Sequence, residues 1–517
     1  MANSPLIASI HILDDDSLLN VFLLYWPFLL GEDEDENGRL VRGSEDWDRA
    51  RWWYKLSLVC PGPKDDEESY SGQHPTWVLD LSLVCTIGTP VADVLAHSPP
   101  LPLVIDYVNG NNDITAEEEE GAILALKHYN RVRRVRLFMS ATSLQKLIVA
   151  MDEEYPILEY LIISGPFQDE SSICQIPETL QAPNLRHLML YGFALPMESR
   201  LLTTAVGLVT LCLQMHHPST YFHPNILLRW LSFMPQLEML AVYFSFPVSN
   251  RDVERQLTQM PITTPIAFPN LHYFQFRGVG TYLEALVDRI TTPRLERLQI
   301  GFFIQLMFSV TRLLQFMNAT ENLTFKSIKF KFSDKFGDVE VYSHEEAKMY
   351  VLPKVSITVD CWHLDWQVSS VAQIFNSLSP LFSAVVHLTL EHWVHSQSFE
   401  EHNKADRTEW RQILGSGRNV KTLRVDEGLV GEVSRCLELD DGELPLELLP
   451  ELQELTCSGS GNTGDAFTSF IDARQDAGRP VTLVHHSPRP DRSSSVPPLE
   501  PPSTTSAGDE AGSDLDT

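Results

Sequence analysis

A glycine-rich stretch near the end of the chain has the spacing of a phosphate-binding loop. Gly459, Gly461 and Gly464 match the pattern GxGxxG, in which backbone amides approach a pyrophosphate at the start of a helix. The stretch follows a strand pattern and precedes a helical pattern over 465–474. However, the next strand pattern ends in two histidines at 485–486, where a dinucleotide site requires an acidic ribose ligand, and no second half of a nucleotide-binding sheet follows. We therefore interpret the stretch as a turn before the terminal helix and predict no cofactor.

Histidines gather around one predicted strand and the loop that follows it. His392 and His395 have a spacing that metal ligands use, but no cysteine or carboxylate arrangement completes a zinc site. Surface histidines are the preferred interpretation for this group and for a second group, and the two groups together comprise His387, His392, His395, His402, His216, His217 and His223.

Residues for acid–base or nucleophilic catalysis do not form a recognisable arrangement. The sequence has no GxSxG elbow, and its cysteines and histidines follow no order typical of a cysteine hydrolase. The paired carboxylates Asp440 and Asp441 precede a proline and fit a solvated turn. The sequence therefore predicts no catalytic residues and no metal ligands, and a protein that is not an enzyme.

A sequence motif recurs along the chain, and the structure that it forms must position any functional residues. Pro183, Leu185, Leu188 and Leu190 form one copy, in which proline is followed by leucines or other aliphatic residues at offsets of two, five and seven. Further copies begin at Pro156, Pro235, Pro269, Pro293 and Pro450, and the segments 385–390 and 420–425 repeat the end of the pattern without the proline.

The end of each copy alternates apolar and polar residues, which is the period of a strand with one buried face. Helical patterns lie between copies, as in 143–151. The equivalent strand positions recur at spacings of roughly 23 to 35 residues, against about 20–29 in regular leucine-rich repeats, and they are Leu137, Ile163, Leu190, Leu213, Val242, Phe276, Ile300, Leu390, Val425 and Cys457.

The predicted fold class is therefore α/β, an irregular leucine-rich-repeat horseshoe with a parallel sheet. A plain alternating helix–sheet sandwich is the alternative. Residues 326–350 are more charged and less regular, and they predict a long strand with a hairpin insertion.

Composition limits the partners. The 517 residues include 69 acidic and 39 basic side chains, for a net charge of −30. Because this charge repels nucleic acid and anionic lipid, neither is an expected partner.

The most apolar run, 18–30, is shorter than the roughly 20 residues of a membrane span and follows acidic residues where a signal peptide carries positive charge. The seven cysteines have no CxxC spacing, which disfavours zinc and a disulfide framework. We expect an intracellular protein, cytoplasmic or nuclear.

The first 85 residues predict a small helical module. Asp14 to Ser17 can cap a helix whose apolar face follows. A second helix runs over about 44–60 and ends at Pro61, and the acidic stretches 32–36 and 65–68 read as loops. The apolar residues of the two helices include Leu13, Leu18, Leu19, Val21, Phe22, Trp53, Leu56, Val59 and Cys60.

This pattern resembles an F-box, and the chain as a whole is similar to the F-box proteins with leucine-rich-like repeats that are abundant in mushroom-forming (basidiomycete) fungi. The closing segment His74-Pro75-Thr76-Trp77 is also similar to that family, whereas Pro61-Gly62-Pro63 stands where the family has Trp-Arg and a third helix. The resemblance implies a substrate-recognition adaptor of an SCF-type cullin–RING ubiquitin ligase. In such an adaptor the F-box docks on the linker subunit, and the repeats bind a protein substrate.

Under this resemblance the docking face comprises Leu13, Leu18, Leu19, Val21, Phe22, Trp53, Leu56 and Val59. The alternative is that these residues only pack the two helices together, in a stand-alone repeat scaffold with a degenerate F-box. The predicted organisation is a helical module at 1–85, a repeat domain at 86–486 and a disordered tail at 487–517, rich in Pro, Ser and Thr.

Overall fold

The computed structural model describes residues 82–108, 114–165, 174–246, 265–303, 308–344, 351–393, 406–438, 447–458 and 463–486. The predicted F-box-like helices, both acidic stretches in the first 85 residues and the predicted tail lie outside the described residues.

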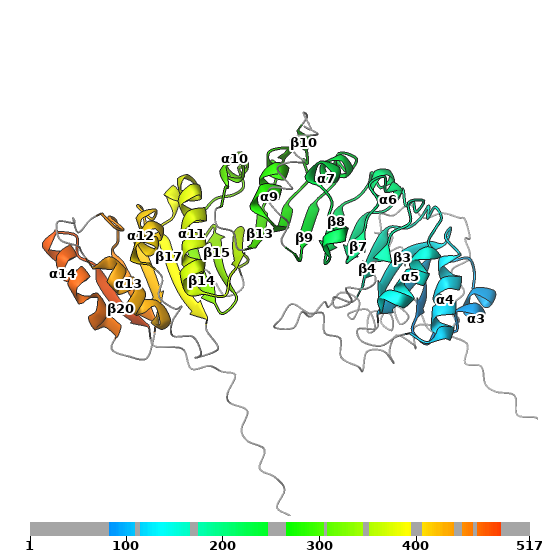
Figure 1. Cartoon of the computed structure of the whole chain (residues 1–517), viewed down its shortest axis with the longest axis horizontal. Coiled ribbons are helices and arrows are strands. Elements are labelled where there is room, and N and C mark those ends of the chain that lie inside the picture. Colours follow the sequence, from blue (N-terminus) through cyan, green and yellow to red (C-terminus); the bar gives the residue numbers. More distant parts are fainter. Residues whose placement is uncertain are drawn as a thin grey trace, which may run out of the picture.

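The described chain forms an arc built on one sheet of sixteen strands (Figure 1). Its order is β1-β2-β3-β4-β6-β8-β9-β11-β13-β16-β15-β14-β17-β18-β19-β20. The strands are β1 (Leu83–Thr86), β2 (Leu103–Val108), β3 (Val132–Phe138), β4 (Tyr160–Ser164), β6 (His187–Tyr191), β8 (Thr210–Met215), β9 (Met239–Phe244), β11 (Tyr273–Gly278), β13 (Arg297–Phe303), β14 (Ser327–Ser333), β15 (Phe336–Tyr342), β16 (Val355–Asp360), β17 (His387–Trp393), β18 (Thr422–Asp426), β19 (Glu454–Ser458) and β20 (Thr482–His486). Two short parallel pairs lie beside it, β5 (Cys174–Gln175) with β7 (Phe193–Ala194) and β10 (Ile266–Ala267) with β12 (Ile290–Thr291).

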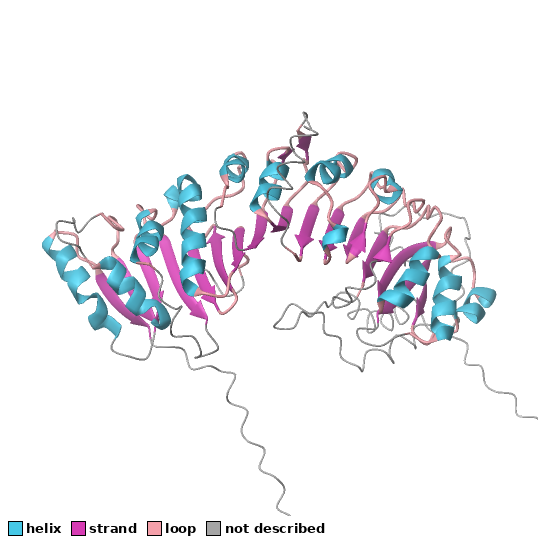
Figure 2. Ribbon diagram, in the orientation of Figure 1, coloured by secondary structure: helices cyan, strands magenta, loops and turns pink. Residues whose placement is uncertain are grey.

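Helices connect successive strands and cover one face of the sheet, while the strands follow the inner side of the arc (Figure 2). The α-helices are α3 (Val91–His97), α4 (Ala116–Leu126), α5 (Ala141–Val149), α6 (Arg200–Thr204), α7 (Pro224–Leu231), α9 (Gly280–Val287), α10 (Thr311–Asn318), α11 (Leu364–Leu378), α12 (Arg407–Gly415), α13 (Val430–Leu437) and α14 (Thr468–Asp476). The 3₁₀ turns are η3 (Pro218–Thr220), η4 (Ser379–Ala384), η5 (Glu427–Leu429) and η6 (Thr463–Phe467).

The strand positions predicted as equivalent fall into one register row. Leu137 pairs with Ile163, which pairs with Leu190, and the row continues through Leu213, Val242, Phe276 and Ile300. On the far side of the insertion Leu390, Val425 and Cys457 continue it. All ten side chains are buried, because alternation turns every second residue toward the helices. The predicted parallel repeat sheet is thus confirmed.

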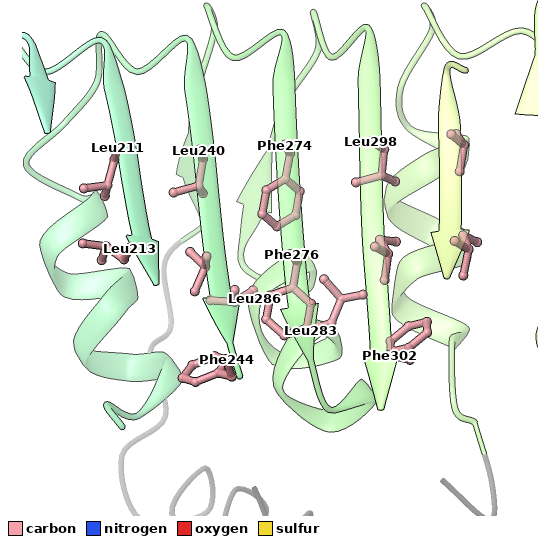
Figure 3. Packing of buried hydrophobic residues seen from close by; sticks show 14 of the residues in the cluster. Leu211, Leu213, Leu240, Phe244, Phe274, Phe276, Leu283, Leu286, Leu298 and Phe302 are labelled. Carbon is pink, nitrogen blue, oxygen red and sulfur yellow. The ribbon is translucent and has the colours of Figure 1, made fainter. Parts of the chain in front are cut away.

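The core lies between the buried face of the sheet and the helices. Figure 3 shows Leu211, Leu240 and Phe274 from successive strands on the side that Leu283 and Leu286 of α9 cover. Aromatic rings fill the middle of the core. The ring centroids of Phe244 and Tyr282 lie 4.9 Å apart, and the Phe276 ring stacks on the Tyr282 ring with their centroids 5.7 Å apart. A Cβ at Gly278 would lie 2.7 Å from the Phe276 ring, so the absence of a side chain there makes room for it.

The predicted hairpin insertion is present and breaks the parallel order. Strand β15 pairs antiparallel with both β14 and β16, whereas β16 pairs parallel with β13 and β14 pairs parallel with β17. The chain therefore passes over two strand positions to form β14, returns to fill them with β15 and β16, and then crosses to β17 through α11. This 15-residue helix packs against all three strands β14, β15 and β16. The pairing of β15 is antiparallel because a tight turn replaces the helical crossover between β14 and β15.

Candidate functional site: the concave face of the sheet

The described helices cover one face of the sheet, and the opposite face, which we call the concave face, is the candidate functional site. It is formed by the strand residues that alternate with the buried ones, such as Arg136 beside Leu137 and Met189 beside Leu190. The open side of a strand–helix repeat array presents side chains at strand spacing, and arrays of this kind use such extended surfaces for binding.

The concave face between β3 and β13 combines arginine, tyrosine and methionine side chains. Among the described strand residues, its positions include the four arginines Arg134, Arg136, Arg277 and Arg297 and no Asp or Glu. Tyr160, Met189, Tyr191, Met239, Tyr243 and Tyr273 lie between them and are partly exposed. Tyrosine, methionine and arginine are the residues enriched at protein interfaces.

One register row runs across this half of the face, and we call it the first row. It consists of Arg134, Tyr160, His187, Thr210, Met239, Tyr273 and Arg297. The Tyr160 and His187 rings lie 5.5 Å apart, and His187 Nδ1 lies 3.1 Å from Thr210 Oγ1. The Arg297 guanidinium lies over the Tyr273 ring, 5.6 Å from its centroid. These contacts fix the side chains before any partner binds.

The polar groups of this half are held in uncharged forms, apart from the arginines. Burial raises the pKa of Tyr273 to about 12 and that of the Cys212 thiol to about 11, and it raises the pKa of Tyr243 further. Burial lowers the pKa of His187, and the charges of Arg186 and Arg134 act in the same direction. At neutral pH these groups therefore act as hydrogen-bond donors and acceptors, and the arginines carry the charge.

The concave face beyond β13 carries charges of both signs that pair with one another. Lys331 binds Glu340 at 2.6 Å and Lys329 binds Glu391 at 3.1 Å. Asp338 is buried and accepts hydrogen bonds from Ser356 at 3.2 Å and Thr358 at 3.0 Å. Burial raises its pKa to about 6, and the charge of Glu340 adds to this effect. The antiparallel insertion and the neighbouring β17 thus carry a polar network in which both lysines are ion-paired.

Histidines that the sequence singled out do not converge. His387 lies on the concave side of β17, where its Nδ1 is 2.5 Å from Thr422 Oγ1. His392 lies on the opposite side of the same strand, opposite the buried Phe332, so the two cannot share one metal ion. His395 and His402 lie outside the described residues. In the part of the chain that the structure describes, no group of three potential ligands comes together.

The second histidine group has a structural role that the sequence did not reveal. His217 caps η3 by accepting from the Ser219 amide at 3.2 Å, and His223 caps α7 by accepting from the Asn225 amide at 3.2 Å. His216 Nδ1 lies 3.0 Å from the Ser245 hydroxyl. A proline directly after both His217 and His223, at the first helical position, is the signal that could have predicted these caps.

The other predicted sites are placed as follows. Gly459 and Gly461 of the glycine motif lie outside the described residues, but the motif does stand between a strand, β19, and a 3₁₀ turn that leads into α14. Asp440 and Asp441 also lie outside them, as do all eight residues of the predicted F-box docking face, Leu13 to Val59. The six cysteines within the described ranges are buried and are not joined in disulfides.

A hollow of about 470 Å³ lies between the end of α10 and η4. Met317, Leu323, Phe325 and Pro380 line it, and Lys326 is the one charged residue among its lining residues. Asn318, Thr320 and Thr324 also line it. A lone lysine among such residues does not make a set of converging titratable groups, so the concave face is the stronger candidate site.

Sequence reasoning did not single out the concave face, although the signal was present in each repeat. The residues between the last apolar positions of a copy, such as His187 and Met189 beside Leu188 and Leu190, are the ones that face the open side.

In the part of the chain that the structure describes, a mostly parallel sheet with leucines in register and helices covering one face has the architecture of an irregular leucine-rich-repeat arc. No protein-family model matches the chain, and no curated protein matches its sequence. Among solved structures, the chain is similar to the leucine-rich repeat-containing protein LegL7 from Legionella pneumophila, with 10% identity and a TM-score of 0.25 over 75% of this chain and 97% of that one. A match this distant adds nothing to what the chain's own sheet shows.

Across the described ranges, every helix is too short or too polar to cross a membrane.

Proposed function

We propose that this chain is a protein-recognition scaffold that binds a partner along its concave face and does no bond chemistry itself. The observation that supports this proposal is the continuous open face between β3 and β13, with partly exposed tyrosine, methionine and arginine side chains at regular spacing. Such side chains supply large contact areas and hydrogen bonds, and tyrosine and arginine are enriched among the residues that dominate binding energy at protein interfaces.

At the finer level, we propose that the scaffold is the substrate-recognition adaptor of an SCF-type cullin–RING ubiquitin ligase. This role rests on the resemblance of the N-terminal sequence to an F-box, with Leu18, Leu19 and Phe22 in the docking face. The arc would hold a protein substrate while the F-box-like segment binds the linker subunit, which raises the effective concentration of the substrate near the ligase. The alternative is a stand-alone scaffold whose F-box no longer docks.

The recognition role is tested by affinity capture with the full chain, quantified for each partner. Met189→Arg with Met239→Arg places bulk and charge on the concave face, so partners that dock there should be lost. Val149→Arg is the matched control, because Val149 is 61% exposed on α5, on the helix side. Equal capture by all three proteins would refute a concave recognition site.

The adaptor role is tested separately with the purified linker subunit. The native chain should bind it, and Leu19→Asp with Phe22→Asp should abolish binding without changing partner capture. If the linker subunit does not bind the native chain, or binds the double variant equally well, the chain is a stand-alone scaffold.

A further inference from the structure

Charge is distributed unevenly over this molecule. The chain carries a net charge of −30, yet the concave strand positions from β3 to β13 present four arginines and no carboxylate. Within the described ranges, acidic residues stand at the borders of this half: Asp106 on β2, Asp360 on β16, and Glu159, Glu238 and Glu296 in the turns that lead into strands.

Two of the four arginines are already neutralised. Arg136 forms two hydrogen bonds with Asp106, at 3.0 and 2.9 Å, and Arg277 binds Asp360 at 2.7 Å. Arg134 and Arg297 form no ion pair with a carboxylate among the described residues. Both lie in the first row, one on β3 and the other on β13.

The distance between these two arginines sets the length of a peptide that could contact both. Six strand spacings of about 4.8 Å place them about 29 Å apart along the sheet, which an extended polypeptide covers with about nine residues. The side chains between them are Tyr160, His187, Thr210, Met239 and Tyr273. The row therefore offers a cation at each end and a mixed aromatic and apolar middle.

We infer that the partner of the concave face is an acidic, extended protein segment that crosses the strands along the first row. Its carboxylates, about eight or nine residues apart, bind Arg134 and Arg297, and apolar side chains between them contact Met239 and the tyrosine rings. The inference rests on the proposed recognition function and names the chemistry of the partner. In the second half of the face Lys329 and Lys331 form ion pairs, and the exposed Arg424 donates a hydrogen bond to Ser458.

The test uses the full chain and dye-labelled peptides of twelve residues, with fluorescence anisotropy at low ionic strength. A chain of this net charge repels anions over most of its surface, so binding of oligo-glutamate requires a local basic site. We expect oligo-glutamate to bind more tightly than oligo-glutamine. Arg134→Glu with Arg297→Glu should weaken that binding by about tenfold or more, because charge reversal places like charges together.

Arg229→Glu is the matched control, since it makes the same change of charge on α7, where Arg229 binds Glu198 at 2.9 Å. It should change the affinity by less than about twofold. Arg134 is exposed, so Arg134→Glu alone keeps the test valid if the double variant does not fold. Equal weakening by Arg134→Glu and Arg229→Glu would show bulk electrostatics and overturn the inference.

Two other outcomes would also overturn it. One is tighter binding of a twelve-residue oligodeoxythymidine than of oligo-glutamate, with the same dependence on Arg134, since that would indicate a nucleic-acid site. The other is a captured protein partner that Met189→Arg with Met239→Arg excludes but Arg134→Glu with Arg297→Glu does not. In that case the recognition function stands and the acidic chemistry of the partner is wrong.

Discussion

At the scale of single residues, the most unusual group is the Asp338 carboxyl. It is 8% exposed and lies beside Glu340, which already pairs with Lys331. Its pKa of about 6 exceeds the value of about 3.9 in an unfolded chain. The folded state therefore binds this proton more tightly. The contribution of Asp338 to stability is complete below about pH 3.9 and is lost as the pH rises through about 6.

Asp338→Asn should therefore stabilise the chain at pH 7.5, by about 1–3 kcal/mol. The amide oxygen still accepts from Ser356 and Thr358, and no charge is buried. The gain should shrink toward zero as the pH falls to 4. Urea unfolding across this pH range measures it, with the exposed Asp472→Asn as control, which should change the free energy of unfolding by less than about 0.5 kcal/mol. A loss of stability at pH 7.5 would show that the charge of Asp338 is needed by its network.

At the scale of elements, the side chains of each strand alternate between the buried face of the sheet and the concave face. Leu188 and Met189 are neighbours in β6, but Leu188 is 0% exposed in the core and Met189 lies on the concave face. Adjacent positions should therefore respond differently to the same truncation.

Leu188→Ala should lower the free energy of unfolding by about 2–5 kcal/mol, because it leaves a cavity between sheet and helices. Met189→Ala should cost less than about 1 kcal/mol and should instead weaken partner binding. Thermal or urea unfolding of the two variants checks the difference. Similar destabilisation by both would mean that β6 is buried on both faces.

At the scale of the whole molecule, the described sheet is open, and β1 and β20 are its edge strands. Stability in such an array comes from contacts between neighbouring repeats. Interior strands such as β9 have neighbours on both sides and aromatic rings above them, whereas β20 is hydrogen-bonded on one side alone and has half-exposed residues.

Hydrogen exchange should therefore be graded along the arc. Amides of β8, β9 and β11 should exchange slowest, and those of β20 among the described strands fastest, because the terminal repeat can open without disrupting its neighbours. Mass spectrometry of peptic peptides that cover 210–215, 239–244 and 482–486 measures this gradient. Equal protection of the three segments would indicate that the sheet unfolds as one cooperative unit.

The sequence by itself determined the repeat and its register. Leu137, Ile163, Leu190 and their successors were assigned as equivalent from the spacing of leucines, and they pair with one another in the sheet. This was possible because strand alternation and leucine spacing are local properties of the chain. The hairpin over 326–350 was visible for the same reason, through its loss of regularity.

Only the tertiary structure decided how distant repeats combine. The placement of β16 beside β13, the opposite faces of His387 and His392, and the common row of Arg134 and Arg297 all depend on strand order and register. Arg134 and Arg297 are more than 160 residues apart in the chain. Which residues face the same partner is therefore set by hydrogen bonding between strands that local sequence patterns do not encode.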